Sequence, residues 1–133
     1  MSENKELDLA KKIDGFTVED ILHLLTGAWE GGSNYWIESV EIGGSPKKRT
    51  IAADIYFPSF QIVPFIGGYL KVQLDEECDN EVHELNLEKI KEAIVLMRTK
   101  HNRHYRDWVG RNDDAATSDV FLQLCLFKEV IFG

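Results

Sequence analysis

The chain has 133 residues, a length typical of one domain, and its 44% hydrophobic and 29% charged residues are a globular rather than a disordered composition. Its 23 acidic and 15 basic residues give a formal net charge of −8, which argues against direct binding to nucleic acid or to an anionic membrane, because such binding depends on Lys and Arg. No apolar run approaches the roughly 20 residues that span a bilayer, and two cysteines without CxxC spacing favour a reducing, cytoplasmic setting.

Residues 1–12 are polar, which predicts a frayed segment and argues against a signal peptide. The first predicted element is a helix over residues 18–29, where apolar side chains recur at helical spacing. Thr17 and Asp20 occupy the N-cap and N3 positions of a capping box. Glycines 31 and 32 are expected to end this helix.

The middle of the chain predicts a small antiparallel sheet. Residues 35–42 and 50–57 form two predicted strands, joined as a hairpin by a glycine-rich turn, and residues 69–74 alternate well enough to predict a third. Residues 58–66 are apolar but interrupted by prolines, so neither a long helix nor a central strand is favoured there. Residues 75–84 carry six acidic side chains and no basic one, which predicts a solvated turn or edge.

Two helices complete the predicted order. Asn86 caps a helix expected to run to about residue 105, and a last helix begins between residues 113 and 118 and continues through residue 131. The last helix is apolar on nearly all sides, which leads us to expect a homodimer that covers it. The fold class is therefore α+β: a single domain over residues 1–133 in which an antiparallel sheet of about three strands packs with three helices.

The acidic segment is the first candidate binding surface. It could mimic nucleic-acid phosphates and occupy a basic surface of a partner protein, or it could serve only solubility. It lacks the spacing of a calcium-binding loop. Its residues are Asp75, Glu76, Glu77, Asp79, Glu81 and Glu84.

A cationic stretch is the second candidate. Arg98, Arg103, Arg106 and Arg111 concentrate positive charge in an acidic chain, which suits a nucleotide phosphate or, alternatively, the negative end of a helix dipole. Tyr35 and Trp36, after the two glycines, could stack on a base, or they could be aromatic core after a helix stop. Neither a dinucleotide-binding loop nor a P-loop motif is present.

Catalytic and metal chemistry find little support. His101 and Asp107 could share a metal, but a zinc site needs three or four ligands, and Cys125 lies in the most apolar helix, where a thiol is usually inert. We therefore expect no metal, no cofactor and no enzymatic activity. Asp119 and Gln123 are polar positions on that same helix, and we expect them to hydrogen-bond to the glycine loop.

Three strings resemble a widespread family of small, largely uncharacterised phage and prophage proteins. They are Glu30-Gly-Gly-Ser-Asn-Tyr-Trp36, the pair Gly67-Gly68 before a strand, and the ending from Ser118 to Gly133, which fits a D-x3-Q-x3-F-x-E-x3-G pattern. The chain departs from the family at Lys128, where the resemblance implies a glycine, and in the apolar segment 58–66.

The resemblance implies an accessory phage protein expressed in the cytoplasm of the bacterial host, of the kind that blunts a host defence. The leading hypothesis is an anti-CRISPR-like inhibitor that binds a defence protein through the acidic segment. The alternatives are a sponge that sequesters a nucleotide signal between the aromatic pair and the arginines, and a helper or enzyme of phage nucleotide metabolism.

Overall fold

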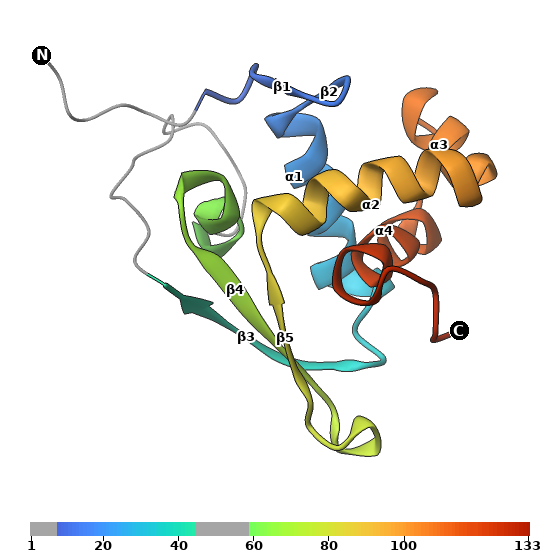
Figure 1. Ribbon diagram of the computed structural model, residues 1–133. Helices are drawn as coiled ribbons and strands as arrows, with labels where there is room; N and C mark the ends of the chain where they lie inside the picture. Colours follow the sequence, from blue (N-terminus) through green and yellow to red (C-terminus); the bar gives the residue numbers. More distant parts are fainter. Residues whose placement is uncertain (1–7, 45–58) are drawn as a thin grey trace, which may run out of the picture.

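The computed structural model describes residues 8–44 and 59–133 (Figure 1). The helices are α1 (Val18–Gly27), α2 (Leu87–Lys100), α3 (Asn102–Val109) and α4 (Ala115–Phe127), with a π-helical turn η1 (Ala28–Gly32) and 3-10 segments η2 (Ser59–Ile66) and η3 (Glu76–Cys78). The strands are β1 (Lys12–Ile13), β2 (Phe16–Thr17), β3 (Ile37–Gly43), β4 (Tyr69–Leu74) and β5 (Val82–Leu85). Helices together with two small antiparallel sheets confirm the α+β class.

The start of α1 follows the predicted capping box. The Thr17 hydroxyl accepts a hydrogen bond of 3.0 Å from the Asp20 amide, and the Asp20 carboxylate accepts one of 3.4 Å from the Thr17 amide. Before it, β1 and β2 form a hairpin whose turn residues Asp14 and Gly15 have φ angles of 54° and 95°. Residues 1–12 were predicted to be frayed, and residues 1–7 of these lie outside the described residues. Lys12 pairs with Thr17 in this hairpin, and the Lys11 carbonyl accepts a hydrogen bond of 2.9 Å from the Val18 amide.

The larger sheet has the order β3-β4-β5, with every neighbouring pair antiparallel. The predicted strands at residues 35–42 and 69–74 correspond to β3 and β4, which pair with each other, whereas the predicted strand 50–57 lies outside the described residues. The third strand, β5, overlaps the segment 75–84, which was predicted to be a solvated turn or edge: the chain turns at residues 75–81, and β5 is an edge strand of the sheet. Leu85, fully buried opposite Leu70, anchors β5 on the core.

The C-terminal half contains one helix more than predicted. The helix that begins at Asn86 is interrupted at His101, whose φ and ψ of −135° and 53° separate α2 from α3. The last helix, α4, ends at Phe127 rather than continuing to Ile131, because Lys128 adopts a left-handed conformation with φ of 65°. Glycine is the residue for which that conformation is least strained.

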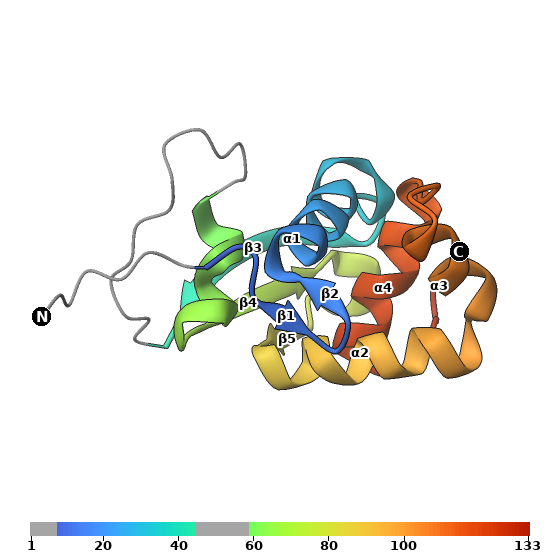
Figure 2. The same cartoon turned by 90° about the horizontal axis from the view of Figure 1, so that it is seen from above.

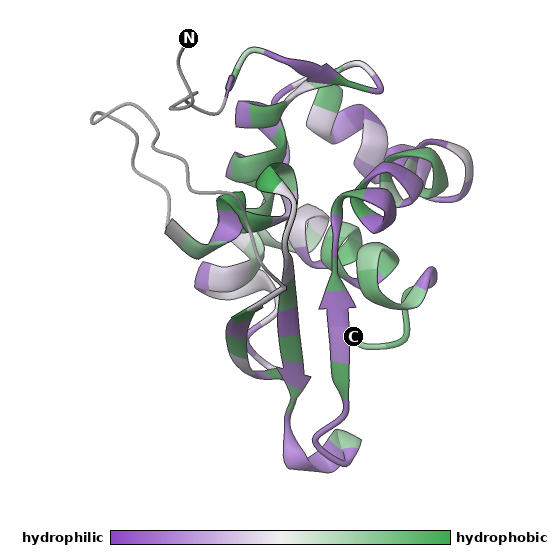
Figure 3. Cartoon of the chain, turned by 60° about the vertical axis from the view of Figure 1, so that its left-hand side comes forward, coloured by the Kyte–Doolittle hydropathy of each residue, from purple (hydrophilic) through white to green (hydrophobic). Residues whose placement is uncertain are grey.

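Helix α4 lies between α1 and α2 and at one face of the sheet (Figures 1 and 2). Nearly all of its residues from Thr117 to Leu126 are buried within the single chain, against α1, α2, α3, η1 and β5. Its apolar sides therefore have intramolecular neighbours, and the reason for expecting a homodimer is removed. The hairpin formed by β4 and β5 extends beyond the helices, with hydrophilic residues at its tip (Figure 3).

Candidate functional site

The acidic residues singled out in the sequence lie mainly at the tip of the β4–β5 hairpin (Figures 1 and 3). The chain turns there through η3 and through Asp79 and Asn80, which have left-handed φ angles of 58° and 52°. The Asp75 carbonyl accepts hydrogen bonds from the amides of Cys78 and Asn80, at 2.9 and 3.1 Å. This tight turn leaves the side chains of Glu76, Glu77 and Asp79 exposed.

The tip of the hairpin lines one side of a hollow of about 580 Å³. Its described lining residues are Tyr35, Glu38, Asp75, Glu76, Glu77 and Asn80, and they include no lysine or arginine. Glu38 was not a predicted site residue. It joins the acidic group because β3 carries a bulge at this position: Ile37 lies opposite Leu74, and Ser39 lies opposite Gln73. No feature of the sequence signals that bulge.

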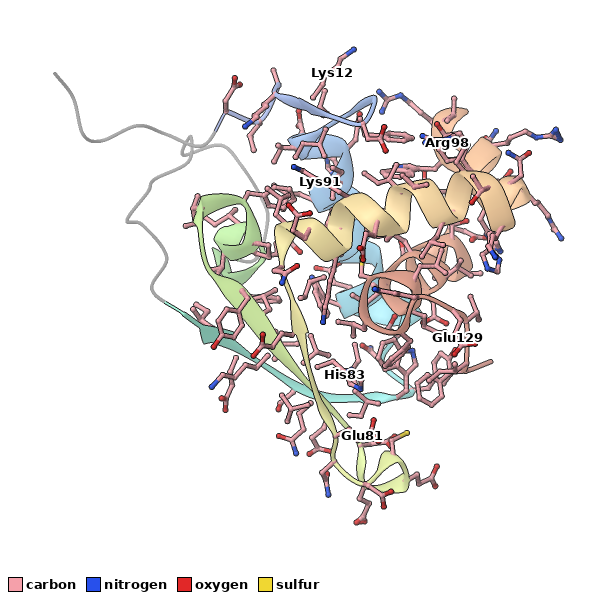
Figure 4. The ribbon with its side chains drawn as sticks, viewed as in Figure 1. Lys12, Glu81, His83, Lys91, Arg98 and Glu129 are labelled. Atoms are coloured by element: carbon pink, nitrogen blue, oxygen red, sulfur yellow. The ribbon has the colours of Figure 1, made fainter. Side chains whose placement is uncertain are left out.

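Two of the six predicted acidic residues lie apart from this hollow. Glu81 accepts from His83 at 3.1 Å, which places an imidazole beside its carboxylate (Figure 4). Glu84 is in register with Lys71 on β4, at the other end of β5 from the tip. The structure therefore brings together Asp75, Glu76 and Glu77 with Glu38, and adds Asp79 at the turn.

Asp75 is the least exposed of the tip carboxylates. Its Oδ1 atom is buried, and no group in residues 8–44 or 59–133 donates a hydrogen bond to it. The Cys78 thiol beside it has a raised pKa, because of desolvation and then of the Asp75 carboxylate, with smaller contributions from Glu81 and Glu77. At neutral pH this thiol is protonated, so it lacks the thiolate that a cysteine nucleophile needs.

Behind the tip, the buried carboxylate of Asp119 collects hydrogen bonds from the segment after η1. Its Oδ1 accepts from the Ser33 hydroxyl and from the Trp36 indole, both at 2.8 Å. Its Oδ2 accepts from the Tyr35 hydroxyl at 2.6 Å and from the Gln123 amide at 3.0 Å. The expected link between Asp119 and the glycine loop is confirmed, and the carboxylate is satisfied by donors rather than by a cation.

Gln123 ties the last residues of the chain to the same network. Its Oε1 atom accepts from the amides of Ile131 and Phe132, each at 2.8 Å. This places the Phe132 ring on Trp36, nearly parallel at 17° with centroids 5.1 Å apart. The expected link between Gln123 and the glycine loop is indirect: it passes through Asp119 and Trp36.

The buried position of Trp36 corrects one prediction. Its side chain is 1% exposed, between Phe127 and Phe132, so its ring offers no face to a nucleotide base. Tyr35 is 52% exposed and lines the acidic hollow. Desolvation of its hydroxyl and the hydrogen bond to Asp119 raise the pKa of Tyr35 to about 12.

The predicted cationic group is dispersed. Arg98 pairs with Asp14 at 3.7 Å and lies 5.9 Å from the Tyr105 ring centroid, while Arg111 reaches Asp20 at 3.6 Å. The side chains of Arg103 and Arg106 are exposed on α3. Arg111 lines a hollow of about 740 Å³ between the β1–β2 hairpin and α3, and neither Tyr35 nor Trp36 is among its described lining residues. The nucleotide site assembled in the sequence from arginines and aromatics is therefore not formed within this chain.

The other residues considered for catalysis or metal binding are the two histidines near the end of α2 and the cysteine in α4. His104 shares a hydrogen bond of 3.1 Å with the Thr117 hydroxyl, and the pKa of His101 is lowered by burial and then by the charges of His104 and Lys100. Complete burial raises the pKa of Cys125. Among the described residues, no three His, Cys, Asp or Glu side chains are grouped so that they could hold a metal ion.

Comparison of the chain with protein-family models, with curated proteins and with solved structures found no match. No helix in the described part of the chain has both the length and the apolar character needed to cross a membrane.

Proposed function

We propose that the protein is a non-enzymatic binding protein whose acidic hairpin tip docks on a basic surface of a partner protein. The observation that carries this proposal is the hollow at the tip, where carboxylates from β3 and from the hairpin turn share one wall with an exposed tyrosine. Like charges held together repel one another, and a cationic partner relieves that repulsion.

The composition of the hollow favours an arginine or lysine side chain as its occupant. The Tyr35 ring offers a face for a cation–π contact, and Glu76 and Glu77 offer acceptors for charge-assisted hydrogen bonds. The Tyr35 hydroxyl is already held by Asp119 at 2.6 Å, so its ring is oriented before a partner arrives. Such preorganisation lowers the entropy lost on binding.

The exposed tip also suits rapid association. The formal net charge of −8 and the projecting carboxylates attract a basic surface from a distance, which raises the association rate and makes it sensitive to salt. The class of partner rests on the family resemblance, which implies a host defence component met in the cytoplasm of a bacterial host. On that basis the binding would be inhibitory, because a docked protein blocks the basic groove that the partner uses.

The nucleotide sponge and the enzyme of nucleotide metabolism have weaker support than docking through the acidic tip. A nucleotide sponge needs Trp36 at a ligand face, and this side chain is buried. A cysteine nucleophile is disfavoured, because the pKa of Cys78 is raised and Cys125 is fully buried. The acidic tip is the feature whose residues are both exposed and grouped.

An NMR titration with an arginine-rich nonapeptide tests the chemistry of the tip. We expect amide shifts concentrated at residues 75–80 and at Tyr35, and their loss in the variant Glu76→Lys/Glu77→Lys. Both positions are exposed and have ordinary backbone angles, whereas Asp75 is half-buried and Asp79 is left-handed. The control Glu88→Lys/Asp113→Lys changes the net charge equally on exposed residues away from the hollow. Equal losses in both variants, or shifts spread over the whole surface, would overturn the proposal.

A further inference from the structure

A third hollow, of about 360 Å³, lies between the β1–β2 hairpin and the first turns of α2. Its described lining residues are Lys11, Lys12, Ile13, Asp14, Leu87 and Lys91. Figure 4 labels Lys12 on the hairpin and Lys91 on α2, at the end of the molecule away from Glu81 and the acidic tip. The sequence did not signal this group, because Lys91 comes from a different element far along the chain.

The two walls of this hollow are held in place by the fold. Ile13 is buried and fixes β1 on the core, and Ile90 fixes the start of α2 in the same way. The ion pair of 3.7 Å between Arg98 and Asp14 joins the hairpin turn to α2. The backbone positions of the three lysines are therefore set before any ligand binds, and only their side chains have to be ordered.

The positive charge of this hollow exceeds the negative charge of its described lining residues. Of the described lining residues, Asp14 alone carries a carboxylate, and Arg98 already pairs with it. Within residues 8–44 and 59–133, none of the ammonium groups of Lys11, Lys12 and Lys91 forms an ion pair or a hydrogen bond. Three cations around one hollow repel one another, and a multivalent anion removes that repulsion.

We infer that this hollow binds a small anion that carries at least two phosphoryl groups. Lysine binds phosphate as a compact charge without a fixed fork geometry, and three lysines exceed the charge that a single phosphate would neutralise. The apolar side chains Ile13 and Leu87 line the hollow beside the lysines. A net charge of −8 repels anions at long range, so saturable binding has to come from this local group.

Calorimetric titration with sodium tripolyphosphate, at an ionic strength of about 0.15 M, tests the site. We expect one saturable site, weakened at least about tenfold in Lys12→Gln/Lys91→Gln because two of its three charges are removed. Both lysines are exposed, and circular dichroism verifies that the variant is folded. The matched control Lys100→Gln/Arg103→Gln removes two exposed cations that do not line the hollow, and we expect it to bind as the unmodified chain does.

Three results would overturn the inference: no saturable heat with the unmodified chain, equal weakening in the control, or unchanged binding in Lys12→Gln/Lys91→Gln. A flotation assay with phosphatidylserine vesicles distinguishes a membrane from a free anion. Vesicle binding that depends on Lys12 and Lys91, without tripolyphosphate binding, would replace the small anion by a lipid surface. Tripolyphosphate binding without flotation would support the small anion.

Discussion

Tyr35 donates a hydrogen bond of 2.6 Å to Asp119, which lies 84 positions later in the chain. This contact joins two of the three strings that carry the family resemblance, the glycine–aromatic segment and the C-terminal pattern. Asp119 and Gln123 are one helical turn apart on α4, so both can face that segment, and the same spacing is conspicuous in the sequence. The hydrogen bonds among Tyr35, Asp119 and Gln123 hold these two segments together, and Tyr35 also lines the acidic hollow.

The Asp119 carboxylate is expected to dominate the stability of this region. In Asp119→Asn, an amide group would face donors that now point at a carboxylate oxygen, so a buried donor would be left without an acceptor. We expect the free energy of unfolding to fall by about 2–4 kcal/mol, measured by urea denaturation. The control Asp107→Asn, a half-buried carboxylate with no described side-chain partner, should change it by less than about 0.5 kcal/mol. Similar values for both variants would contradict this role.

The raised pKa of Tyr35 leads us to expect a loss of folding stability at high pH. Its pKa is raised to about 12 in the folded chain from an ordinary value of 10, so the unfolded chain releases this proton first. The stabilising contribution is complete below pH 10 and is lost as the pH rises from about 10 to about 12. Urea midpoints across this range should fall more steeply for the unmodified chain than for Tyr35→Phe. Parallel curves would show that the Tyr35 hydroxyl titrates at its ordinary value.

The two adjacent glycines of the glycine–aromatic segment are predicted to differ in their tolerance of a side chain. A Cβ at Gly32 would collide with the Ala115 carbonyl of α4, whereas one at Gly31 would meet no described atom. Gly32→Ala should therefore lower the free energy of unfolding by about 1–3 kcal/mol because the contact with α4 is overpacked. Gly31→Ala is the matched control and should be nearly neutral. Equal effects in thermal denaturation would refute the close approach of η1 to α4.

Lys128 offers a prediction in the stabilising direction. Its left-handed φ of 65° strains a residue that has a Cβ, so Lys128→Gly should raise the free energy of unfolding by about 1 kcal/mol. The substitution also removes the exposed ion pair with Glu92 at 3.5 Å, a contact worth little in solvent. Lys128→Ala removes the same ion pair but keeps the strain, so it should not stabilise. A gain of the same size with alanine would assign the effect to the ion pair instead.

Local signals in the sequence predicted the starts of helices better than their ends or the pairing of strands. The capping box at Thr17 and the cap at Asn86 located the starts of α1 and α2, because both depend on hydrogen bonds to residues nearby in the chain. Strand β5 was predicted only as a solvated turn or edge, because a single buried residue, Leu85, anchors it and the surrounding charges conceal the alternation of a strand. The break at His101 likewise has no proline or glycine to mark it.

The candidate site was predicted in part for the same reason. Acidic residues close in sequence meet at the hairpin tip, but Glu38 joins them through a bulge that only the pairing of β3 with β4 defines. The arginines were close in sequence too, yet a helix break and the partners Asp14 and Asp20 direct them apart. The sequence left both ligand binding and aromatic core open for Trp36, and the tertiary contact with Phe132 places it in the core.

The most direct test of docking through the acidic tip is a native pull-down from a lysate of the proposed bacterial host with three forms of the chain, read by mass spectrometry. The unmodified chain and the control Glu88→Lys/Asp113→Lys should each retain the same host protein in stoichiometric amount. The variant Glu76→Lys/Glu77→Lys should lose it, because a basic surface would then meet lysines at the tip. A partner retained equally by all three forms, or no partner retained by any, would contradict docking through the acidic hairpin.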